Sequence, residues 1–462
     1  MMAVPWIPRP RMLAVGVLAI AALVPAAPAA AKPVVLDRTF GGGDGIMDDA
    51  LDSPSALPPI MDQSPDGTIA LAQSSNGASP VETVALVTPD GRSVRAKVQL
   101  PGFRIEDVAF QSDGKLLVSG SSGDRFAVAR VTRAGTLDPA YAGDGIYESV
   151  TGDASEIAVE PSGSAIVVGS RIERIGPSGS LQAFQTDDAR EVALGPDGAI
   201  LAVSGADIIR LTPALAPDPG FAPDIGDLHR IQDVEVQADG RILVANRPDD
   251  PGGHLPQLPS VILDRLLANG GRDTAFTRLT NAPWPHVVPD DLAIDPSGRI
   301  VIAGSFFSRP DPEESRVPDA LLARTLPSGA LDRTFATRDT PASSRNATDV
   351  VLQGDGKILV SHGVYGSTRL AVSRYFPQTR CGGRRATHLG SRAGETIQGT
   401  NGRDVIVALG GSDRLLGLRG DDVICGGKGR DRLLGGRGRD RLFGGKGADI
   451  LRGGRGHDLQ SQ

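Results

Sequence analysis

Aromatic residues are scarce in this chain of 462 residues, where Phe, Trp and Tyr together make up 4%. A large core must therefore be built from Val, Ile, Leu and Ala. Histidine is also rare, and none of its six positions has a metal-ligand spacing to another. The chain lacks a nucleophile elbow, a phosphate-binding loop and a paired-carboxylate motif. These absences predict no catalytic residue and no organic cofactor site, and they favour a protein that is not an enzyme.

Long apolar stretches are almost missing as well. The one candidate, residues 12–24, is an apolar run of thirteen, which is too short to span a bilayer comfortably. Arg9 and Arg11 precede it, and the small residues 29–31 follow it, as at the cleavage site of a signal peptide. Residues 1–31 are therefore predicted to be a signal peptide, with an uncleaved anchor as the alternative. We expect a secreted, extracellular or surface-associated protein without a membrane span after cleavage.

Cysteine occurs only twice, at Cys381 and Cys425. In an exported protein an isolated pair favours a disulfide, and two unpaired thiols are the alternative. Charge is shared unevenly along the chain, because residues 380–462 carry a net charge of +7 and residues 32–379 carry −16. The acidic larger part argues against nucleic acid as a partner.

Residues 32–379 contain seven copies of one phrase, of which DVAFQSDGKLLVSG (107–120) is the clearest. Each copy has an apolar strand, a turn with glycine and a β-branched strand, and Asp-Gly between alternating strands is a strong hairpin signal. The spacing of the copies, 35 to 58 residues, is near the size of a four-stranded propeller blade. We therefore predict an all-β, seven-bladed β-propeller. The turn glycines are residues 67, 114, 163, 198, 240, 298 and 356.

A second phrase, RAGTLDPAYAGDGI (133–146), follows several copies, and SGALDRTF (328–335) repeats it. The last copy, which ends at residue 376, lacks this half, whereas LDRTFGGGDGI (36–46) supplies it near the N-terminus. We expect this N-terminal segment to provide the outer strand that closes the last blade and removes two exposed sheet edges. These phrases resemble the delta-60 family of bacterial β-propeller repeats, a resemblance that implies a fold but no activity.

From Gln398 the chain repeats every nine residues, in seven units such as CGGKGRDRL and LGGRGRDRL. The pattern resembles the RTX, or haemolysin-type, calcium-binding repeat. That resemblance implies a parallel β-roll over residues 394–462, preceded by a linker or cap at 380–393. The expected metal ligands are the side chains of Asp404, Asp413, Asp422, Asp431, Asp440, Asp449 and Asp458. The turn backbone is expected from Gly402, Gly411, Gly420, Gly429, Gly438, Gly447 and Gly456.

The nine-residue spacing also has a physical reason. Calcium takes six to eight oxygen ligands, and one aspartate with the carbonyls of two stacked turns meets that demand. A strand of three residues buries little, so stacking is needed to build a core. The residues expected to point inward are Ile406, Leu415, Ile424, Leu433, Leu442 and Leu451.

A roll with two units per coil places alternate aspartates on one side. Sites between successive coils then give up to about five calcium ions, and the first two are expected to be weaker because units one to three lack the full glycine pair. We predict that the roll folds only on binding calcium, since stacked aspartates repel one another. The alternative is a glycine-rich roll that needs no metal. A bond between Cys381 and Cys425 would pin the cap.

Arginines crowd these aspartates, and Arg430 and Arg439 directly precede two of them. They could partly neutralise the aspartates and weaken calcium binding, or they could simply be solvated. For the whole chain we predict a calcium-binding protein whose propeller is a platform for a protein or carbohydrate partner. The alternative is a lyase or hydrolase with a site in the central funnel. A funnel lined by converging His, Asp, Glu or Arg would favour the enzyme, and one lined by Val, Ser and Ala would favour binding.

Overall fold

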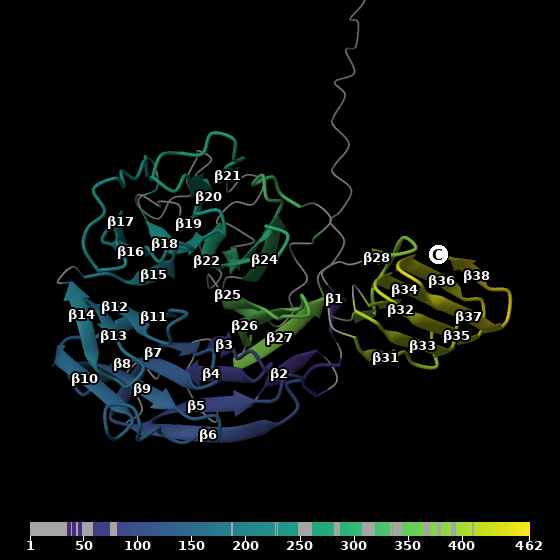
Figure 1. Cartoon of the computed structure of the whole chain (residues 1–462), viewed down its shortest axis with the longest axis horizontal. Helices are drawn as coiled ribbons and strands as arrows, with labels where there is room; N and C mark the ends of the chain where they lie inside the picture. The colour runs from purple at the N-terminus through teal and green to yellow at the C-terminus, as the bar shows by residue number, and fades with distance from the viewer. Residues whose placement is uncertain are drawn as a thin grey trace, which may run out of the picture.

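The computed structural model describes residues 35–37, 39–42, 45–48, 59–73, 81–185, 188–226, 228, 230–247, 261–280, 287–306, 319–332, 335, 344–364, 370–376, 380–389, 394–408 and 411–462 (Figure 1). The expected signal peptide lies outside these residues. Every regular element in the described part is a β-strand. The strands form a seven-bladed propeller followed by a parallel β-solenoid of about four turns, which confirms the predicted fold class.

The first three blades are four-stranded antiparallel sheets. They contain β3 (Ile60–Gln63), β4 (Ile69–Gln73), β5 (Val81–Val87) and β6 (Val94–Pro101); β7 (Phe103–Phe110), β8 (Leu116–Ser122), β9 (Arg125–Val131) and β10 (Ile146–Thr151); and β11 (Ala154–Val159), β12 (Ala165–Gly169), β13 (Ile172–Ile175) and β14 (Leu181–Gln185).

The fourth blade contains β15 (Glu191–Leu194), β16 (Ile200–Ser204) and β17 (Asp207–Leu211). The fifth contains β18 (Ile231–Val236), β19 (Ile242–Asn246), β20 (Val261–Leu266) and β21 (Leu279–Thr280). The sixth contains β22 (Val287–Ile294), β23 (Ile300–Phe306) and β24 (Asp319–Thr325), and the seventh contains β25 (Ser344–Leu352), β26 (Ile358–Val364) and β27 (Leu370–Phe376). One residue pair, between Asp319 and Arg345, links the sixth and seventh blades into one sheet.

The first strand of each blade lines the centre of the ring. These seven strands, β3, β7, β11, β15, β18, β22 and β25, each contact the next, and β25 contacts β3 again. The predicted tight turn joins each of these strands to the second strand of the same blade. The turn glycines have positive φ, for example +78° at Gly114 and +82° at Gly356, a conformation that other residues resist. The hairpin signal therefore located the inner face of every blade.

The N-terminal segment closes the ring as predicted. Strands β1 (Val35–Leu36) and β2 (Ile46–Asp48) both pair with β27, the last strand of the seventh blade. The buried side chains of Arg374 and Asp37 form an ion pair at 2.8 Å, and the Arg374 guanidinium stacks on Phe40. Arg324 makes the same contacts with residues 332 and 335 within one blade. The LDRTF phrase thus supplies the acid and the aromatic ring that each such arginine requires.

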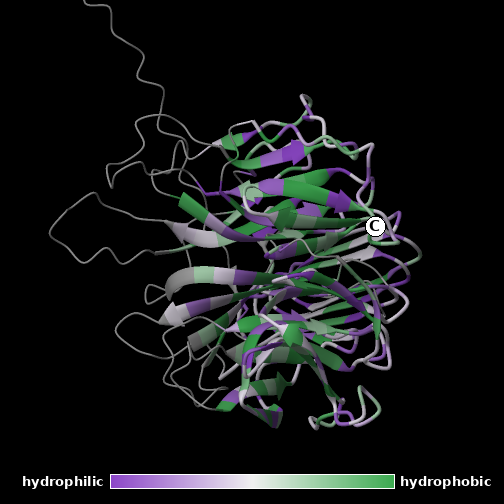
Figure 2. Ribbon diagram, turned by 90° about the vertical axis from the view of Figure 1, so that its left-hand side faces the viewer, coloured by the Kyte–Doolittle hydropathy of each residue, from purple (hydrophilic) through white to green (hydrophobic). Residues whose placement is uncertain are grey.

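Small aliphatic side chains fill the spaces between blades, as the low aromatic content predicted. A cluster between the first and second blades contains Val, Leu, Ile and Ala with a single buried aromatic residue, Phe103. Figure 2 shows hydrophobic residues distributed along the blade strands, with polar ones between them. The second strands are buried along their length, for example β12, because both faces of a blade pack on neighbouring blades.

The C-terminal roll consists of two parallel sheets. The first contains β30 (His388–Leu389), β32 (Val405–Val407), β34 (Val423–Lys428), β36 (Arg441–Lys446) and β38 (Leu459–Ser461). The second contains β31 (Thr396–Gln398), β33 (Arg414–Arg419), β35 (Arg432–Arg437) and β37 (Ile450–Arg455). Five of the six predicted inward residues are buried, and Leu451 in the last coil is partly buried.

A short hairpin covers the outer face of the first roll sheet. It comprises β28 (Arg380–Cys381) and β29 (Arg384–Arg385), and Cys381 packs with Val405, Val423 and Phe443. Cys381 and Cys425 form the predicted disulfide, with 5.8 Å between their Cα atoms. The bond ties the hairpin to the fourth unit of the roll.

Candidate calcium sites and the propeller channel

The aspartates of the roll form two ladders along its axis. In six of the seven aspartates, all except Asp404, one oxygen accepts the backbone N–H of the residue 18 positions earlier, one coil away. Asp422 accepts from Asp404 at 2.8 Å, and Asp440 accepts from Asp422 at 3.0 Å. On the other side Asp431 accepts from Asp413 at 2.9 Å. Two units therefore make one coil, and the structure brings together the alternate aspartates that the sequence placed on each side.

The second oxygen of five of these carboxylates has no hydrogen-bond donor. The atoms are Oδ2 of Asp413, Asp422, Asp431, Asp440 and Asp449, and all are buried. A buried carboxylate oxygen without a partner is costly, at about 1–3 kcal/mol or more. Five such atoms on a regular period form a set of oxygen ligands suited to cations. Calcium, which prefers hard oxygen ligands, fits them.

Three of these oxygens face a space that a methyl group would fill. A Cβ atom at Gly417 would lie 2.4 Å from Asp422 Oδ2 and 2.5 Å from the carbonyl oxygen of Gly435 in the next coil. The same two kinds of oxygen surround a Cβ built at Gly426, beside Asp431, and at Gly435, beside Asp440. Each space therefore brings a carboxylate and a carbonyl of the next coil together, as a calcium site requires. We call these three spaces the glycine cradles.

The first two units differ from these three in other ways. A Cβ atom at Gly399 would also lie 2.7 Å from Asp404 Oδ2 and 3.1 Å from the carbonyl oxygen of Gly417, so the first unit differs only in its carboxylate. Asp404 Oδ2 already accepts the backbone N–H of Thr400 at 2.7 Å and its hydroxyl at 3.0 Å. In the second unit Ala408 stands one coil before Gly426, because residues 407 and 425 are paired in register. Ala408 therefore carries a methyl group at the position equivalent to a cradle glycine, and it is buried in the inner apolar cluster of the roll. Asp413 Oδ2 in the same unit has no hydrogen-bond partner. Both features support the expectation that the first two sites are weaker.

The cradle glycines were not among the predicted site residues. The predicted glycines, two positions before each aspartate, instead allow the coils to stack. A Cβ at Gly438, for example, would lie 1.8 Å from the carbonyl oxygen of Gly420 in the previous coil. The cradle glycine lies five positions before its aspartate and occurs in six of the seven units. Its single replacement, Ala408, was the sequence signal that could have identified it.

Burial and mutual repulsion perturb the aspartates. Burial, followed by the charges of Asp440 and Asp404, raises the pKa of Asp422 to about 7. Burial also raises the pKa of Asp431 and Asp440. No three His, Cys, Asp or Glu side chains converge on one point in the described part of the chain, so a site here would need backbone carbonyls. A divalent cation would offset the repulsion that these shifts reflect.

The arginines next to the aspartates line the same hollow as Asp413 and Asp431 but form no ion pair with them. Arg414, Arg430 and Arg432 are exposed, whereas Asp413 and Asp431 are buried. None of these three arginines forms an ion pair with a described aspartate. Two other arginines of the roll do have partners. Arg403 pairs with Asp421, and Arg441 donates a hydrogen bond to the carbonyl of residue 382. The geometry thus gives no support to direct neutralisation of the predicted ligands.

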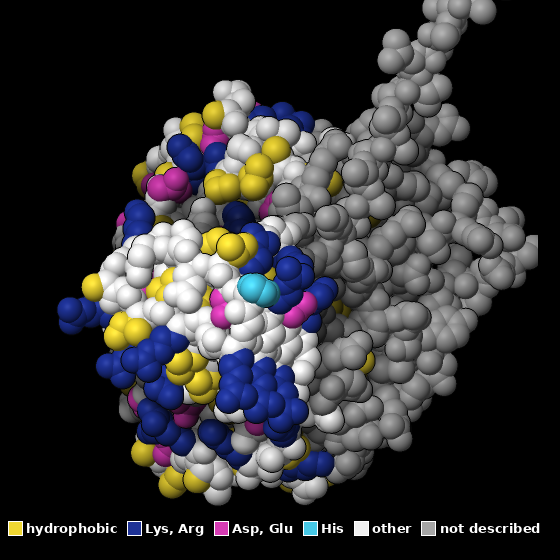
Figure 3. Space-filling view, turned by 90° about the vertical axis from the view of Figure 1, so that its right-hand side faces the viewer, with side chains coloured by type: hydrophobic (Ala, Val, Ile, Leu, Met, Phe, Trp, Pro, Cys, Tyr) yellow, Lys and Arg dark blue, Asp and Glu magenta, His cyan; other side chains and the backbone are white. Residues whose placement is uncertain are grey.

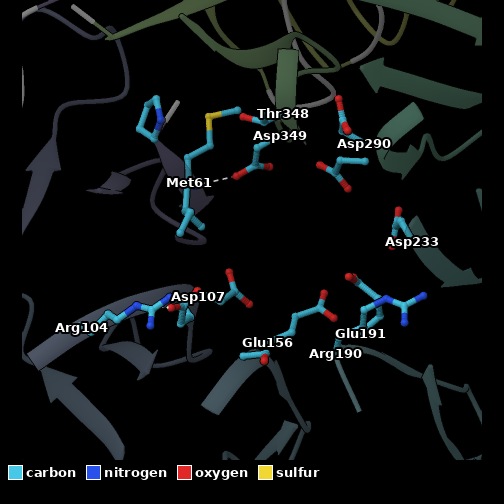
Figure 4. Close-up of a pocket in the computed structure, with 15 residues that line it drawn as sticks. Met61, Arg104, Asp107, Glu156, Arg190, Glu191, Asp233, Asp290, Thr348 and Asp349 are labelled. Atoms are coloured by element: carbon cyan, nitrogen blue, oxygen red, sulfur yellow. Dashed lines mark hydrogen bonds and ion pairs between the residues drawn. The ribbon is translucent and has the colours of Figure 1, made fainter. Parts of the chain in front are cut away.

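The propeller has a second candidate site, its central channel, with a volume of about 460 Å³. Figure 4 shows carboxylates from different blades pointing into this space. The lining combines Glu106, Asp107, Glu156, Glu191, Asp233, Asp290, Asp291 and Asp349 with Arg104 and Arg190. This acidic lining is the outcome that the sequence analysis associated with an enzyme, and it differs from the Val, Ser and Ala lining expected of a binding platform.

The channel carboxylates hold neighbouring blades together. Asp107 accepts the N–H of Ile157 in the next blade at 3.0 Å, and Asp233 accepts that of Leu292 at 2.8 Å. Asp349 accepts the N–H of Met61, which joins the last blade to the first. The acid stands seven residues before the turn glycine in six of the seven repeats. That period was visible in the sequence, but its role requires the ring geometry.

Crowding also perturbs these acids. Burial raises the pKa of Asp107, Glu191 and Asp349 to about 7. Burial and neighbouring carboxylates raise the pKa of Asp233 and Asp291 well above the usual range. Arg190, at the channel wall, donates to two backbone carbonyls rather than to these acids. The channel is therefore lined by structural acceptors whose pKa values are raised by burial.

Comparisons with known families recognise both parts of the chain. The family described as RTX calcium-binding nonapeptide repeat (4 copies) matches residues 389–424 and 426–459. The family described as domain of unknown function (DUF5122) beta-propeller matches residues 111–141 and 296–335. The chain thus carries RTX calcium-binding repeats and a DUF5122 propeller domain. The description of this propeller family does not include the name delta-60, which the sequence analysis used for the resemblance. No curated protein sequence matches the chain.

Solved structures share the propeller fold at low sequence identity. A catalytically inactive virginiamycin B lyase from Staphylococcus aureus with quinupristin is 13% identical, with a TM-score of 0.50, and covers 72% of this chain and 99% of its own. YCF48 bound to D1 peptide is 15% identical, with a TM-score of 0.46, and covers 76% of this chain and 99% of its own. At such identity the first likeness shows the fold alone. No helix in the described residues could cross a membrane.

Proposed function

We propose that this chain is a secreted calcium-binding protein in which calcium folds the roll and the propeller serves as a binding platform. The observation that carries the calcium part is the set of five buried Oδ2 atoms without donors, spaced at the period of the RTX repeat. A glycine-rich roll that needs no metal would not leave one carboxylate oxygen of five units buried and unpartnered.

Three sites are proposed to be complete. They use Asp422, Asp431 and Asp440, each beside a glycine cradle and a carbonyl of the next coil. Two further positions, at Asp404 and Asp413, bring the possible total to about five ions but bind more weakly. Thr400 already satisfies the first, and in the second Ala408 stands at the position equivalent to a cradle glycine.

The proposed location outside the cell rests on two features. Residues 1–31 have the sequence pattern of a signal peptide. RTX repeats also fit an environment in which calcium is abundant, because the metal-free aspartate ladder is electrostatically unfavourable. The partner of the propeller is proposed to be a protein or a carbohydrate.

We propose that the channel is not catalytic, because its carboxylates already act as acceptors for backbone amides between blades. The second candidate, a lyase or hydrolase, is favoured by the convergence of acids whose pKa values lie near 7. A screen against polysaccharides and esters tests it. An activity that is lost in Glu191→Gln, with the fold intact, would favour the enzyme.

Calorimetric titration of residues 32–462 with calcium tests the main proposal. We expect about three tight ions, and we expect magnesium to compete poorly because it demands a smaller and more regular site. The triple variant Asp422→Asn, Asp431→Asn and Asp440→Asn should lose them. Asp421→Asn removes an acid from the same turns, where it contacts Arg403 and not a cradle, and should keep all three ions. Undiminished binding in the triple variant would contradict the assignment.

A further inference from the structure

One turn face of the roll carries a row of arginines without acids. Arg419, Arg437 and Arg455 occupy the same position in three successive coils, and register pairs place them directly beside one another. All three are exposed, and none forms an ion pair with a described residue. We call them the arginine row. Adjacent strands are about 4.8 Å apart, so the row presents one guanidinium per coil at roughly that spacing.

The neighbouring row shows that the same turns can pair their own charges. There Asp421 stands between Arg403 and Arg439, accepts the backbone N–H of Arg439 at 2.9 Å and contacts the Arg403 guanidinium at 3.4 Å. The arginine row has no such acid, although like charges in direct register are destabilising. On the opposite turn face the equivalent row contains Lys428 and Lys446 in place of arginine.

Arginine suits a partner with planar anionic groups. Its guanidinium binds carboxylates through two parallel hydrogen bonds, which lysine cannot do. Seen from the side on which the roll lies in Figure 1, Lys and Arg side chains gather in groups and acidic ones are few (Figure 3). The roll is therefore a cationic surface on a protein whose net charge is −7.

The spacing and composition of this surface select among polyanions. An extended peptide presents successive side chains on one face about 6.7 Å apart, which does not match the row. Duplex DNA carries a charge about every 1.7 Å and would also face the repulsion of an acidic protein. Single-stranded nucleic acid requires aromatic stacking partners, and the arginine row and its neighbours include none. A linear polysaccharide with one carboxylate per sugar ring needs no stacking partner and offers the planar anionic group that a guanidinium binds through two hydrogen bonds.

We propose that the arginine row is a docking surface for an acidic polysaccharide, laid along the axis of the roll with its carboxylates on the exposed guanidinium groups. This goes beyond calcium binding, because the ligand is recognised by exposed guanidinium groups and not by the buried aspartates.

The test uses residues 32–462 in saturating calcium, with short oligogalacturonides, which do not gel, as the probe. Replacing Arg419, Arg437 and Arg455 by Gln should weaken binding about tenfold, as expected for the loss of three exposed ion pairs. Replacing Lys428, Arg430 and Lys446 by Gln makes the same charge change on the opposite turn face and should alter binding by less than about twofold. Circular dichroism in calcium verifies that both variants keep the roll.

Four outcomes would overturn the proposal. The first is equal weakening in the two triple variants, which would indicate only non-specific attraction. The second is equally tight binding of the fully methyl-esterified oligosaccharide, which lacks the charge. The third is tighter binding of oligo-dT or of phosphatidylglycerol vesicles, which would assign the surface to nucleic acid or lipid. The last is no binding of the oligogalacturonide by a chain whose calcium-loaded roll is folded, a result that leaves the calcium proposal intact.

Discussion

Gly435→Ala is the sharpest perturbation of a single calcium site. The added methyl group would lie 2.4 Å from Asp440 Oδ2 and 2.6 Å from the carbonyl oxygen of Gly453. Gly435 does not have positive φ, so alanine introduces no backbone strain of that kind. The substitution therefore fills the cradle beside Asp440 and leaves in place the Gly435 backbone carbonyl, which faces the cradle at Gly417.

The size of the effect follows from those distances. Ordinary contacts of a Cβ atom begin near 3.4 Å, so each oxygen must move away from the new methyl group by about 1 Å. Overpacking of this kind costs roughly 1–3 kcal/mol. That range corresponds to a site about 5- to 150-fold weaker. The natural Ala408 places a methyl group at the same position of the second unit, and the variant should resemble it.

Calorimetric counting of tight calcium ions measures the result, and we expect the count to fall from three to two. Gly444→Ala is the matched control, because its methyl group would lie 2.6 Å from Asp449 Oδ2 but has no carbonyl of a following coil among its nearest neighbours. The control should keep three ions. Unchanged calcium binding in Gly435→Ala, or equal loss in both variants, would refute the cradle as the site.

Three further predictions concern stability. Asp37→Ala leaves the Arg374 charge buried without its partner and should lower the free energy of unfolding by about 3–5 kcal/mol. It should also make the N-terminal strand accessible to proteases. Asp332→Ala, the control, should destabilise the propeller without exposing that strand. Replacing Cys381 and Cys425 by Ser opens a loop of 44 residues, should cost about 4 kcal/mol and should raise the calcium concentration at which the roll folds; an unchanged midpoint would contradict the role of the bond. Because the folded-state pKa of Asp107 is raised to about 7, its stabilising effect is complete below pH 4 and is lost as the pH rises through 7. In chelator the free energy of unfolding should therefore be larger at pH 6 than at pH 8 by about 1 kcal/mol or more, and the protein should melt at a higher temperature at pH 6. Asp107→Asn should reduce that difference.

Periodic features were predictable from the sequence because they repeat. The Asp-Gly turns located the inner hairpins, and the nine-residue period gave the two-unit coil and the inward residues. The missing half of the last propeller repeat predicted that residues 36–46 would close the ring. In each case a local pattern had only one way to bury its apolar face.

Features that depend on contacts between repeats were not predictable in the same way. From the sequence alone, Asp107 and its counterparts in other repeats look like ordinary strand residues. Their role appears only when the ring places the backbone amide of the next blade, such as that of Ile157, opposite the carboxylate. The cradle at Gly435 likewise appears only when the next coil brings the Gly453 carbonyl close. Both involve partners many residues away, which strand periodicity does not encode.

Hydrogen exchange across residues 411–462 of the full-length mature chain tests the central claim most directly. With calcium, the backbone amides of β33 to β37 should exchange slowly, because the stacked coils bury and bond them. In excess chelator the same amides should exchange at rates near those of an unfolded chain, while the propeller stays protected. Slow exchange of the roll in chelator, equal to that in calcium, would contradict the account.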